Sequence, residues 1–130
     1  LTLGNLYSVR DWGHAKDYAR SMWKIMQYKK PDDWVIATNQ IMNVKQFVSL
    51  SAKKLGLNII WKNKNENEIG VNQKTGKTII KIDKKFFRPG EVDFLKGNFK
   101  KAKKLLKWTP SYNINQLIDE MINHELNSYE

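Results

Sequence analysis

A predicted strand and a predicted helix are separated by the stretch Phe86-Phe87-Arg88-Pro89-Gly90-Glu91-Val92-Asp93-Phe94-Leu95. It contains one of only three arginines, against twenty lysines. Pro89-Gly90 is a turn pair that ends the preceding element. A planar guanidinium at Arg88 and a carboxylate at Glu91 on one turn suit a ligand with phosphates at one end and hydroxyls at the other. A salt bridge within a surface loop is the plainer interpretation of the same residues.

The composition indicates a folded chain of modest size. The 130 residues are 41% hydrophobic and 12% aromatic, which favours one domain over residues 1–130 with a modest core. No apolar run approaches the roughly 18 residues that a membrane helix needs, and no signal peptide is visible. The chain has no cysteine, which excludes disulfides and thiolate chemistry and fits a cytoplasmic setting.

The net positive charge of the chain suggests a second class of function, nucleic-acid binding. A net charge of +10 is typical of proteins that bind nucleic acid. However, the lysines are scattered through every segment, with one dense cluster at residues 100–107. Within that cluster the spacing places the lysines on the solvent-exposed face of a predicted helix. A small basic nucleic-acid-binding module therefore stays as the less favoured alternative.

The first half of the chain predicts two helices and a strand. Apolar residues spaced by three and four predict an amphipathic helix that starts at Ala15 and ends before Pro31. The apolar positions of this helix are Ala15, Tyr18, Ala19, Met22, Trp23 and Met26. Residues 34–37 read as a short buried strand. Asn43 with Gln46 resembles a capping box that opens a second helix, which Gly56 ends.

The second half predicts two strands and two helices. Residues 57–61 and 78–83 read as strands on either side of a mostly polar segment. Asn98 begins a third helix, and Asn113 with Gln116 caps a fourth. The predicted buried residues of the fourth helix are Leu117, Ile118, Met121, Ile122 and Leu126. Helices alternating with short strands predict an α/β fold of about four helices.

The motifs favour binding over catalysis. The chain contains no G-x-G-x-x-G, no P-loop and no Tyr-x-x-x-Lys pair. Neither His14 nor His124 has metal ligands at a suitable spacing, so we expect structural or surface roles for both and no metal site. Arg10 and Arg88 lie beside turns and next to aromatic residues, outside the predicted helices, whereas Arg20 is predicted on the solvated face of the first helix. Two guanidiniums that converge on a diphosphate would explain arginine at Arg10 and Arg88.

With these residues in hand, the chain resembles the carboxyl-terminal part of the GDP-mannose 4,6-dehydratases, a branch of the extended short-chain dehydrogenase/reductase family. The run Arg10-Asp11-Trp12-Gly13-His14-Ala15-Lys16-Asp17-Tyr18 is specific for this branch, whereas Arg-Pro-x-Glu/Asp is shared with other nucleotide-sugar enzymes. The resemblance also rests on residues 3–6, 31–38, 74–77, 87–95 and 102–110. It covers nearly the whole chain, in order.

The resemblance implies a substrate-binding region without its catalytic half. In the family, an amino-terminal Rossmann half binds NADP and carries the catalytic residues, and the carboxyl-terminal half closes over the nucleotide-sugar. By position, Arg10 and Arg88 would bind the diphosphate of GDP-mannose or GDP, and Glu91 would bind the ribose hydroxyls. Asn5 would line the same pocket. The intact parent would be an NADP-dependent lyase, cytoplasmic and homo-oligomeric, while this stretch alone would hold neither cofactor nor catalytic residues and would be inactive.

Two departures from the family pattern affect loops. Gly90 stands where threonine is usual, which loosens the turn, and Asn39 stands where glycine is usual. The missing catalytic half is the larger departure and suggests a piece of a longer protein. It also leaves a related GDP-sugar reductase or epimerase with the same carboxyl-terminal half as an alternative.

Overall fold

The chain folds into two units, each built from two separate segments, in a computed structural model that describes residues 1–88 and 90–128. Unit 1 comprises Leu1–Val9 and Asn43–Phe94, and unit 2 comprises Arg10–Met42 and the segment from Leu95 onward. The chain leaves unit 1 within strand β2 (Val9–Asp11) and returns within β3 (Ile41–Asn43), and these strands pair with each other. That residues 1–130 act as one domain stays a prediction.

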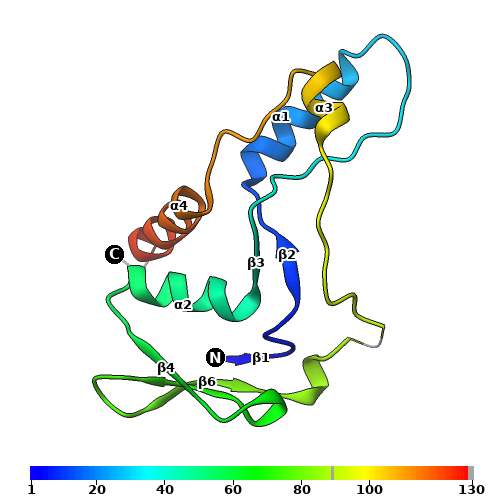
Figure 1. Cartoon of the computed structure of the whole chain (residues 1–130). Helices are drawn as coiled ribbons and strands as arrows, with labels where there is room; N and C mark the ends of the chain where they lie inside the picture. The colour runs from blue at the N-terminus through cyan, green and yellow to red at the C-terminus, as the bar shows by residue number, and fades with distance from the viewer. Residues whose placement is uncertain (89, 129–130) are drawn as a thin grey trace. The chain divides into compact units, whose positions relative to one another are not determined.

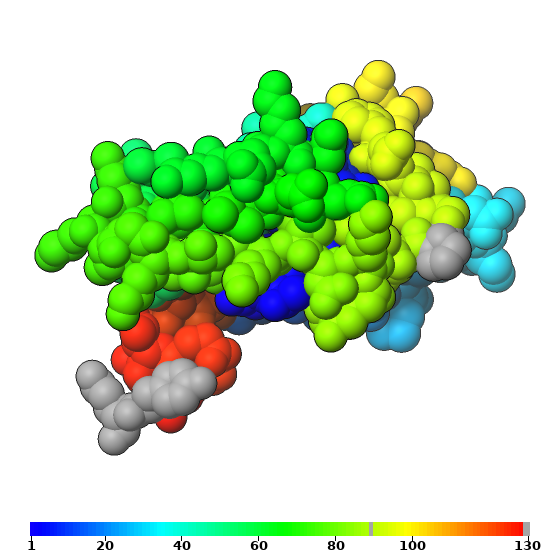
Figure 2. Space-filling model, turned by 90° about the horizontal axis from the view of Figure 1, so that it is seen from below, coloured from blue at the N-terminus to red at the C-terminus, as the bar shows by residue number. Residues whose placement is uncertain are grey.

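Unit 1 is built on a four-stranded sheet. Its order is β1-β6-β5-β4, formed by β1 (Thr2–Leu3), β6 (Thr78–Ile82), β5 (Ile69–Asn72) and β4 (Ile59–Lys62). β1 runs parallel to β6, and the other neighbours are antiparallel. Figure 2 shows unit 1 from below, and the residues from the middle of the chain are green and yellow-green in this view. β5 lies within the mostly polar segment between the two predicted strands, and sequence analysis does not predict it.

Helix α2 (Val44–Lys54) covers the sheet of unit 1 (Figure 1) and begins where the capping box predicts. The Asn43 side chain accepts from the Gln46 N–H, and the Gln46 side chain accepts from the Asn43 N–H. Gly56 has φ +73° directly after the helix, a conformation that favours glycine. The buried apolar residues of unit 1 are Leu6, Ala52, Val71 and Ile80.

The described part of unit 2, residues 10–42 and 95–128, contains three helices and extended segments. α1 (Ala15–Met26) begins where the sequence predicts but ends well before Pro31, and α3 (Lys100–Leu105) and α4 (Ile114–Asn127) also form. Asn113 and Gln116 make a second capping box at the start of α4. Figure 1 shows α1 and α3 side by side, where Ala102, Leu106 and Trp108 form a buried cluster. The residues packed against that cluster are Ile25, Tyr28, Trp34, Ile36 and Phe99. The predicted mixed α/β architecture of four helices and short strands is confirmed.

Several predictions about unit 2 are wrong. In α4, Met121 and Leu126 are each 54% exposed, against the prediction that both are buried. In α1, the apolar residues Met22, Trp23 and Met26 are 64%, 59% and 73% exposed, although Ile25 packs against the buried cluster. The buried residues of that helix are polar, Asp17 and Ser21. Residues 34–37 are not a strand; the chain next pairs at β3. Periodicity reports which residues share a helix face, whereas the covered face depends on what packs there.

Within residues 1–88 and 90–128, no helix combines the length and apolar character needed to cross a membrane. The predicted Pro89-Gly90 turn includes Pro89, which lies outside the described residues. On its carboxyl side, Gly90 has φ +70°, and the Glu91 N–H donates to the Arg88 carbonyl at 3.2 Å. A hydrogen bond over three residues marks a chain reversal at this point.

Candidate functional site

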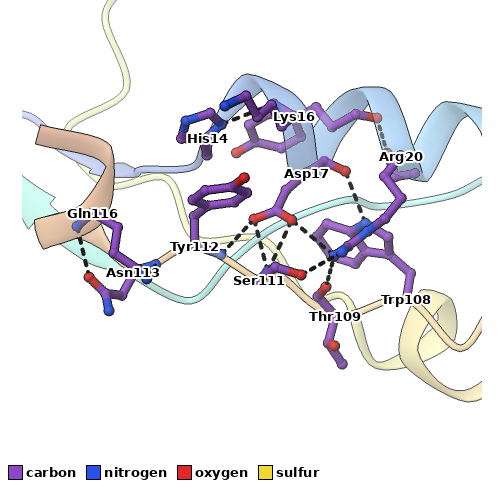
Figure 3. Close-up of polar contacts among 12 residues, drawn as sticks. His14, Lys16, Asp17, Arg20, Trp108, Thr109, Ser111, Tyr112, Asn113 and Gln116 are labelled. Atoms are coloured by element: carbon purple, nitrogen blue, oxygen red, sulfur yellow. Dashed lines mark hydrogen bonds and ion pairs between the residues drawn. The ribbon is translucent and has the colours of Figure 1, made fainter. Parts of the chain in front are cut away.

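Asp17, near the end of the Arg10–Tyr18 run, is a buried connector within unit 2. Its carboxylate is 1% exposed and accepts from the Ser111 N–H with both oxygens, at 3.0 and 2.9 Å. It also accepts from the Tyr112 N–H at 3.0 Å, and its own backbone carbonyl accepts from the Trp108 indole N–H at 3.0 Å. Figure 3 shows these bonds joining α1 to residues 108–112. The role of Asp17 is therefore structural.

Arg20 completes the same network, and its side chain is 40% exposed, so it is partly solvated as predicted and is also bonded within unit 2. Its Nη2 donates to Asp17 at 2.9 Å, and the guanidinium also bonds the Thr109 carbonyl and the Ser111 hydroxyl (Figure 3). The guanidinium fork reaches three acceptors at once, which an ammonium group does less well. One of the three arginines of the chain is thus explained by folding.

His14 is the amino-terminal cap of α1. Its Nδ1 accepts from the Lys16 N–H at 3.1 Å, so Nε2 carries the proton and donates to Glu120 at 3.1 Å. The ring is 7% exposed and stacks on Tyr112 with centroids 4.1 Å apart. The bond from Lys16 chiefly holds the pKa of Glu120 below its ordinary value, with a smaller contribution from His14. The structural role predicted for His14 agrees with this geometry.

Asp11 fixes the loop after Ala37. Its Oδ1 accepts from both the N–H and the hydroxyl of Thr38 at 2.7 Å, and its Oδ2 accepts from the Asn39 N–H at 2.9 Å. Asn39 has φ +61°, a left-handed conformation that glycine adopts freely and asparagine tolerates. The asparagine at this position is therefore compatible with the loop.

Arg10 lines a pocket of unit 2. The pocket has a volume of about 340 Å³, and its wall is formed by Arg10, Asp11, Tyr18, Ile36, Ala37, Leu95, Lys96 and Gly97. Arg10 itself is half-buried. Burial raises the pKa of the Tyr18 hydroxyl, and the carboxylates of Asp11 and Asp17 add to the effect. Tyr18 therefore stays protonated at neutral pH and is able to donate a hydrogen bond.

Arg88 lines a different pocket, which belongs to unit 1. That pocket has a volume of about 440 Å³, and its wall is formed by Thr2, Leu3, Gly4, Lys85, Phe86, Phe87 and Arg88. Arg88 is exposed, as expected for a side chain that meets a ligand from solvent. Gly4 contacts the Phe86 backbone so closely that any side chain at position 4 would collide with it. Glycine therefore brings β1 against the segment that carries Arg88.

Asn5 lies at a third pocket, also in unit 1. Its side-chain oxygen accepts from the Tyr7 N–H at 2.9 Å, and Asn5, Tyr7 and Phe87 help to line a pocket of about 160 Å³. The Tyr7 hydroxyl donates to the buried carboxylate of Glu68 at 2.6 Å, and this bond raises the pKa of Tyr7. Lys45 pairs with the same carboxylate. Sequence analysis does not single out Glu68, because it lies in a polar segment.

The predicted site residues are thus distributed over both units. Asn5, Arg88 and Glu91 belong to unit 1, and Arg10 belongs to unit 2. Convergence of the two guanidiniums stays a prediction. Of the lysines in the 100–107 cluster, Lys101 is held by Asp32 and by the Asp33 carbonyl, and α3 is only six residues long. Nucleic-acid binding by this face also stays a prediction.

Comparison with solved structures identifies the fold. A UDP-glucose 4-epimerase from Thermotoga maritima, solved with UDP-glucose, matches with a TM-score of 0.75 at 18% identity, covering 100% of this chain and 36% of that one. A second match, RMD from Pseudomonas aeruginosa complexed with NADPH, has a TM-score of 0.68 at 14% identity and covers 95% of this chain and 34% of that one. The chain therefore has the fold of about a third of each of these proteins.

Sequence comparison gives the family. The family model described as GDP-mannose 4,6 dehydratase matches residues 1–121, and the chain belongs to this family. A GDP-mannose 4,6 dehydratase from Homo sapiens is 46% identical over 126 residues, which are 97% of this chain and 34% of the relative. The chain spans about a third of the length of the curated relatives that it matches. The family predicted from the Arg10–Tyr18 and Phe87–Leu95 runs is confirmed.

Proposed function

We propose that this chain is the nucleotide-sugar-binding part of a GDP-mannose 4,6-dehydratase, which converts GDP-mannose to GDP-4-keto-6-deoxymannose. The observation that carries the proposal is that, within the region matched by the family, Arg10 and Arg88 each line a pocket of their own unit. Arg20 lines neither of these pockets, and its guanidinium pairs with Asp17. The two arginines that line these pockets are therefore the two assigned to the ligand.

Each assigned residue has a chemical role in the proposal. Arg10 and Arg88 bind the diphosphate through charge-assisted hydrogen bonds, for which a guanidinium fork is suited. Glu91 accepts hydrogen bonds from the ribose hydroxyls, and Asn5 lines the ligand site. Glu91 is held near Arg88 by the bond from its N–H to the Arg88 carbonyl. One short turn would thus bind both the diphosphate and the ribose of a nucleoside diphosphate.

The redox chemistry belongs to the rest of the parent polypeptide. The sequence has no G-x-G-x-x-G and no Tyr-x-x-x-Lys, so its own residues do not fit a dinucleotide. We assign NADP and the lyase reaction to the parent, and we expect this chain alone to be inactive. The proposal further includes a cytoplasmic, homo-oligomeric parent.

Calorimetric titration of the 130-residue protein tests the proposal. GDP and GDP-mannose should bind, and Arg10→Ala or Arg88→Ala should each weaken binding by about 2–5 kcal/mol, as when one partner of a charged contact is truncated. Lys77→Ala removes one exposed positive charge outside the three pockets described above, and it should leave the affinity unchanged. Circular dichroism checks that each variant folds.

The titration also separates the alternatives. Absence of nucleotide binding, or equal effects of the Arg10, Arg88 and Lys77 variants, would overturn the proposal. Tight binding of arbitrary duplex DNA with a steep salt dependence would support the nucleic-acid module instead. The product formed by the intact parent from GDP-mannose distinguishes the dehydratase from a GDP-sugar reductase or epimerase.

A further inference from the structure

We infer that the pocket around Arg10 is a diphosphate-binding site of unit 2 in which Lys96 is the second cation. The inference rests on the proposed function and deepens it, because it names a ligand-binding residue that neither the motifs nor the family match single out. Lys96 lies between the predicted Phe86–Leu95 stretch and the lysine cluster at 100–107. It lines the same pocket wall as Arg10.

The backbone of the pocket wall is fixed by close packing. A Cβ added to Gly97 would collide with the Cβ of Ala37, so only glycine allows the 95–97 segment to lie this close to residues 36–37. On the other side, Asp11 binds Thr38 and Asn39 through three hydrogen bonds. Lys96 is therefore carried on a segment whose position is set by its neighbours, although its own side chain is exposed.

The charges and polar groups of the wall suit an anion. Arg10 and Lys96 contribute two positive charges, and Asp11 contributes one negative charge. Both oxygens of Asp11 already accept hydrogen bonds from the 38–39 segment, which reduces their effect on a ligand. The protonated hydroxyl of Tyr18 adds a neutral donor. The wall thus offers a fork, a point charge and a hydroxyl to phosphate oxygens.

Size and polarity favour a diphosphate over a whole nucleotide. A volume of about 340 Å³ lies at the lower end of the range for small-molecule sites. Ile36, Ala37 and Leu95 form the apolar part of the wall, and reduced contact with water strengthens charge–charge attraction. The pocket therefore suits the charged group of the ligand, while the nucleoside and the sugar extend beyond it.

Titration of the 130-residue protein with pyrophosphate tests the inference, with Lys96→Gln, Lys96→Arg and Lys104→Gln as variants. Lys96→Gln should raise the Kd for pyrophosphate about tenfold, the lower end for a hydrogen bond to a charged group. Lys96→Arg should restore most of the affinity. Lys104→Gln removes the same charge from an exposed position on α3 that is not part of this pocket wall, and it should change the Kd less than about twofold.

Amide chemical shifts give a second readout that does not depend on affinity alone. Pyrophosphate should shift the amide signal of Gly97 in the wild-type protein, and in Lys96→Gln the same shift should need about tenfold more pyrophosphate. An unchanged Kd in Lys96→Gln, or a wild-type protein that binds no pyrophosphate, overturns the inference. Lys96 is exposed, so its substitution should leave the fold intact, and circular dichroism verifies this.

A parallel titration with GDP separates this inference from the proposed function. If GDP binding depends on Arg10 and Arg88 but not on Lys96, the inference is wrong and the proposed function stands. If pyrophosphate binding depends on Lys96 and Arg10 but GDP binds no more tightly than pyrophosphate, the anion site is supported and the nucleotide assignment fails.

Discussion

Removal of the Asp17 carboxylate should destabilise unit 2 more than any change at an exposed acidic residue. In Asp17→Ala, the N–H groups of Ser111 and Tyr112 lose their acceptor, and Arg20 loses its ion-pair partner. Each orphaned buried donor costs about 1–3 kcal/mol, and loss of the ion pair adds less than for a fully buried pair, because the Arg20 side chain is 40% exposed. Because these terms overlap, we expect a loss of about 3–5 kcal/mol in the free energy of unfolding, a large share of the 5–15 kcal/mol typical of a domain.

Urea unfolding followed by tryptophan fluorescence and circular dichroism measures this loss. The fully buried Trp108 donates to the Asp17 carbonyl and therefore reports on the same region. Asp17→Asn keeps one acceptor oxygen and should cost less than Asp17→Ala. Asp33→Ala, at an exposed position of the same unit, is the matched control and should change stability by less than about 0.5 kcal/mol. A loss below about 1 kcal/mol in Asp17→Ala, or an equal loss in the control, would refute the structural role of this carboxylate.

Three further predictions concern other contacts. The pKa of Glu120 is lowered in the folded chain, chiefly by Lys16. The contribution of Glu120 to stability should therefore be complete above its ordinary pKa of 4.5 and lost as pH falls through the lower folded value. NMR titration should show the Glu120 pKa rising in Lys16→Met, and an unchanged pKa contradicts this. Asn113→Ala removes the cap of α4 and should cost about 1 kcal/mol in urea unfolding, whereas Asn115→Ala, beyond the cap, should cost little. Gly97→Ala should lower Tm, because the new methyl group collides with the side chain of Ala37. Adding Ala37→Gly should recover part of the lost Tm. No recovery would show that the collision with Ala37 is not the cause.

Local sequence patterns predict the helices of this fold well because the determinants are themselves local. The capping boxes at Asn43 and Asn113 involve residues three positions apart, and both helices begin where these patterns indicate. The orientation of α1 is not local. Its apolar residues Met22, Trp23 and Met26 are exposed, and Asp17 and Ser21 are buried, because Asp17 is satisfied by residues more than ninety positions away. The two-unit organisation has the same cause, since each unit joins distant segments.

The candidate site shows the same division between local and distant information. Arg10 and Arg88 are noticeable because arginine is rare in this lysine-rich chain, and each lines a pocket. Most of the polar residues around Arg10 prove structural: Asp11 holds a loop, His14 caps a helix and Asp17 binds residues 111–112. Lys96 could not be found by its type, because it is one lysine among twenty. Only the proximity of residues 95–97 to the Arg10 pocket identifies it.

The alternation of segments between the units also sets an order of events during synthesis on the ribosome. All of unit 1 has been translated once Phe94 is added, so its sheet and α2 can close early. The carboxylate of Asp17 must wait for Ser111 and Tyr112, a delay of about 5–19 s at typical translation rates of about 5–20 residues per second. During that interval the carboxylate of Asp17 is hydrated and lacks its folded-state donors, so α1 cannot yet be fixed to residues 108–112.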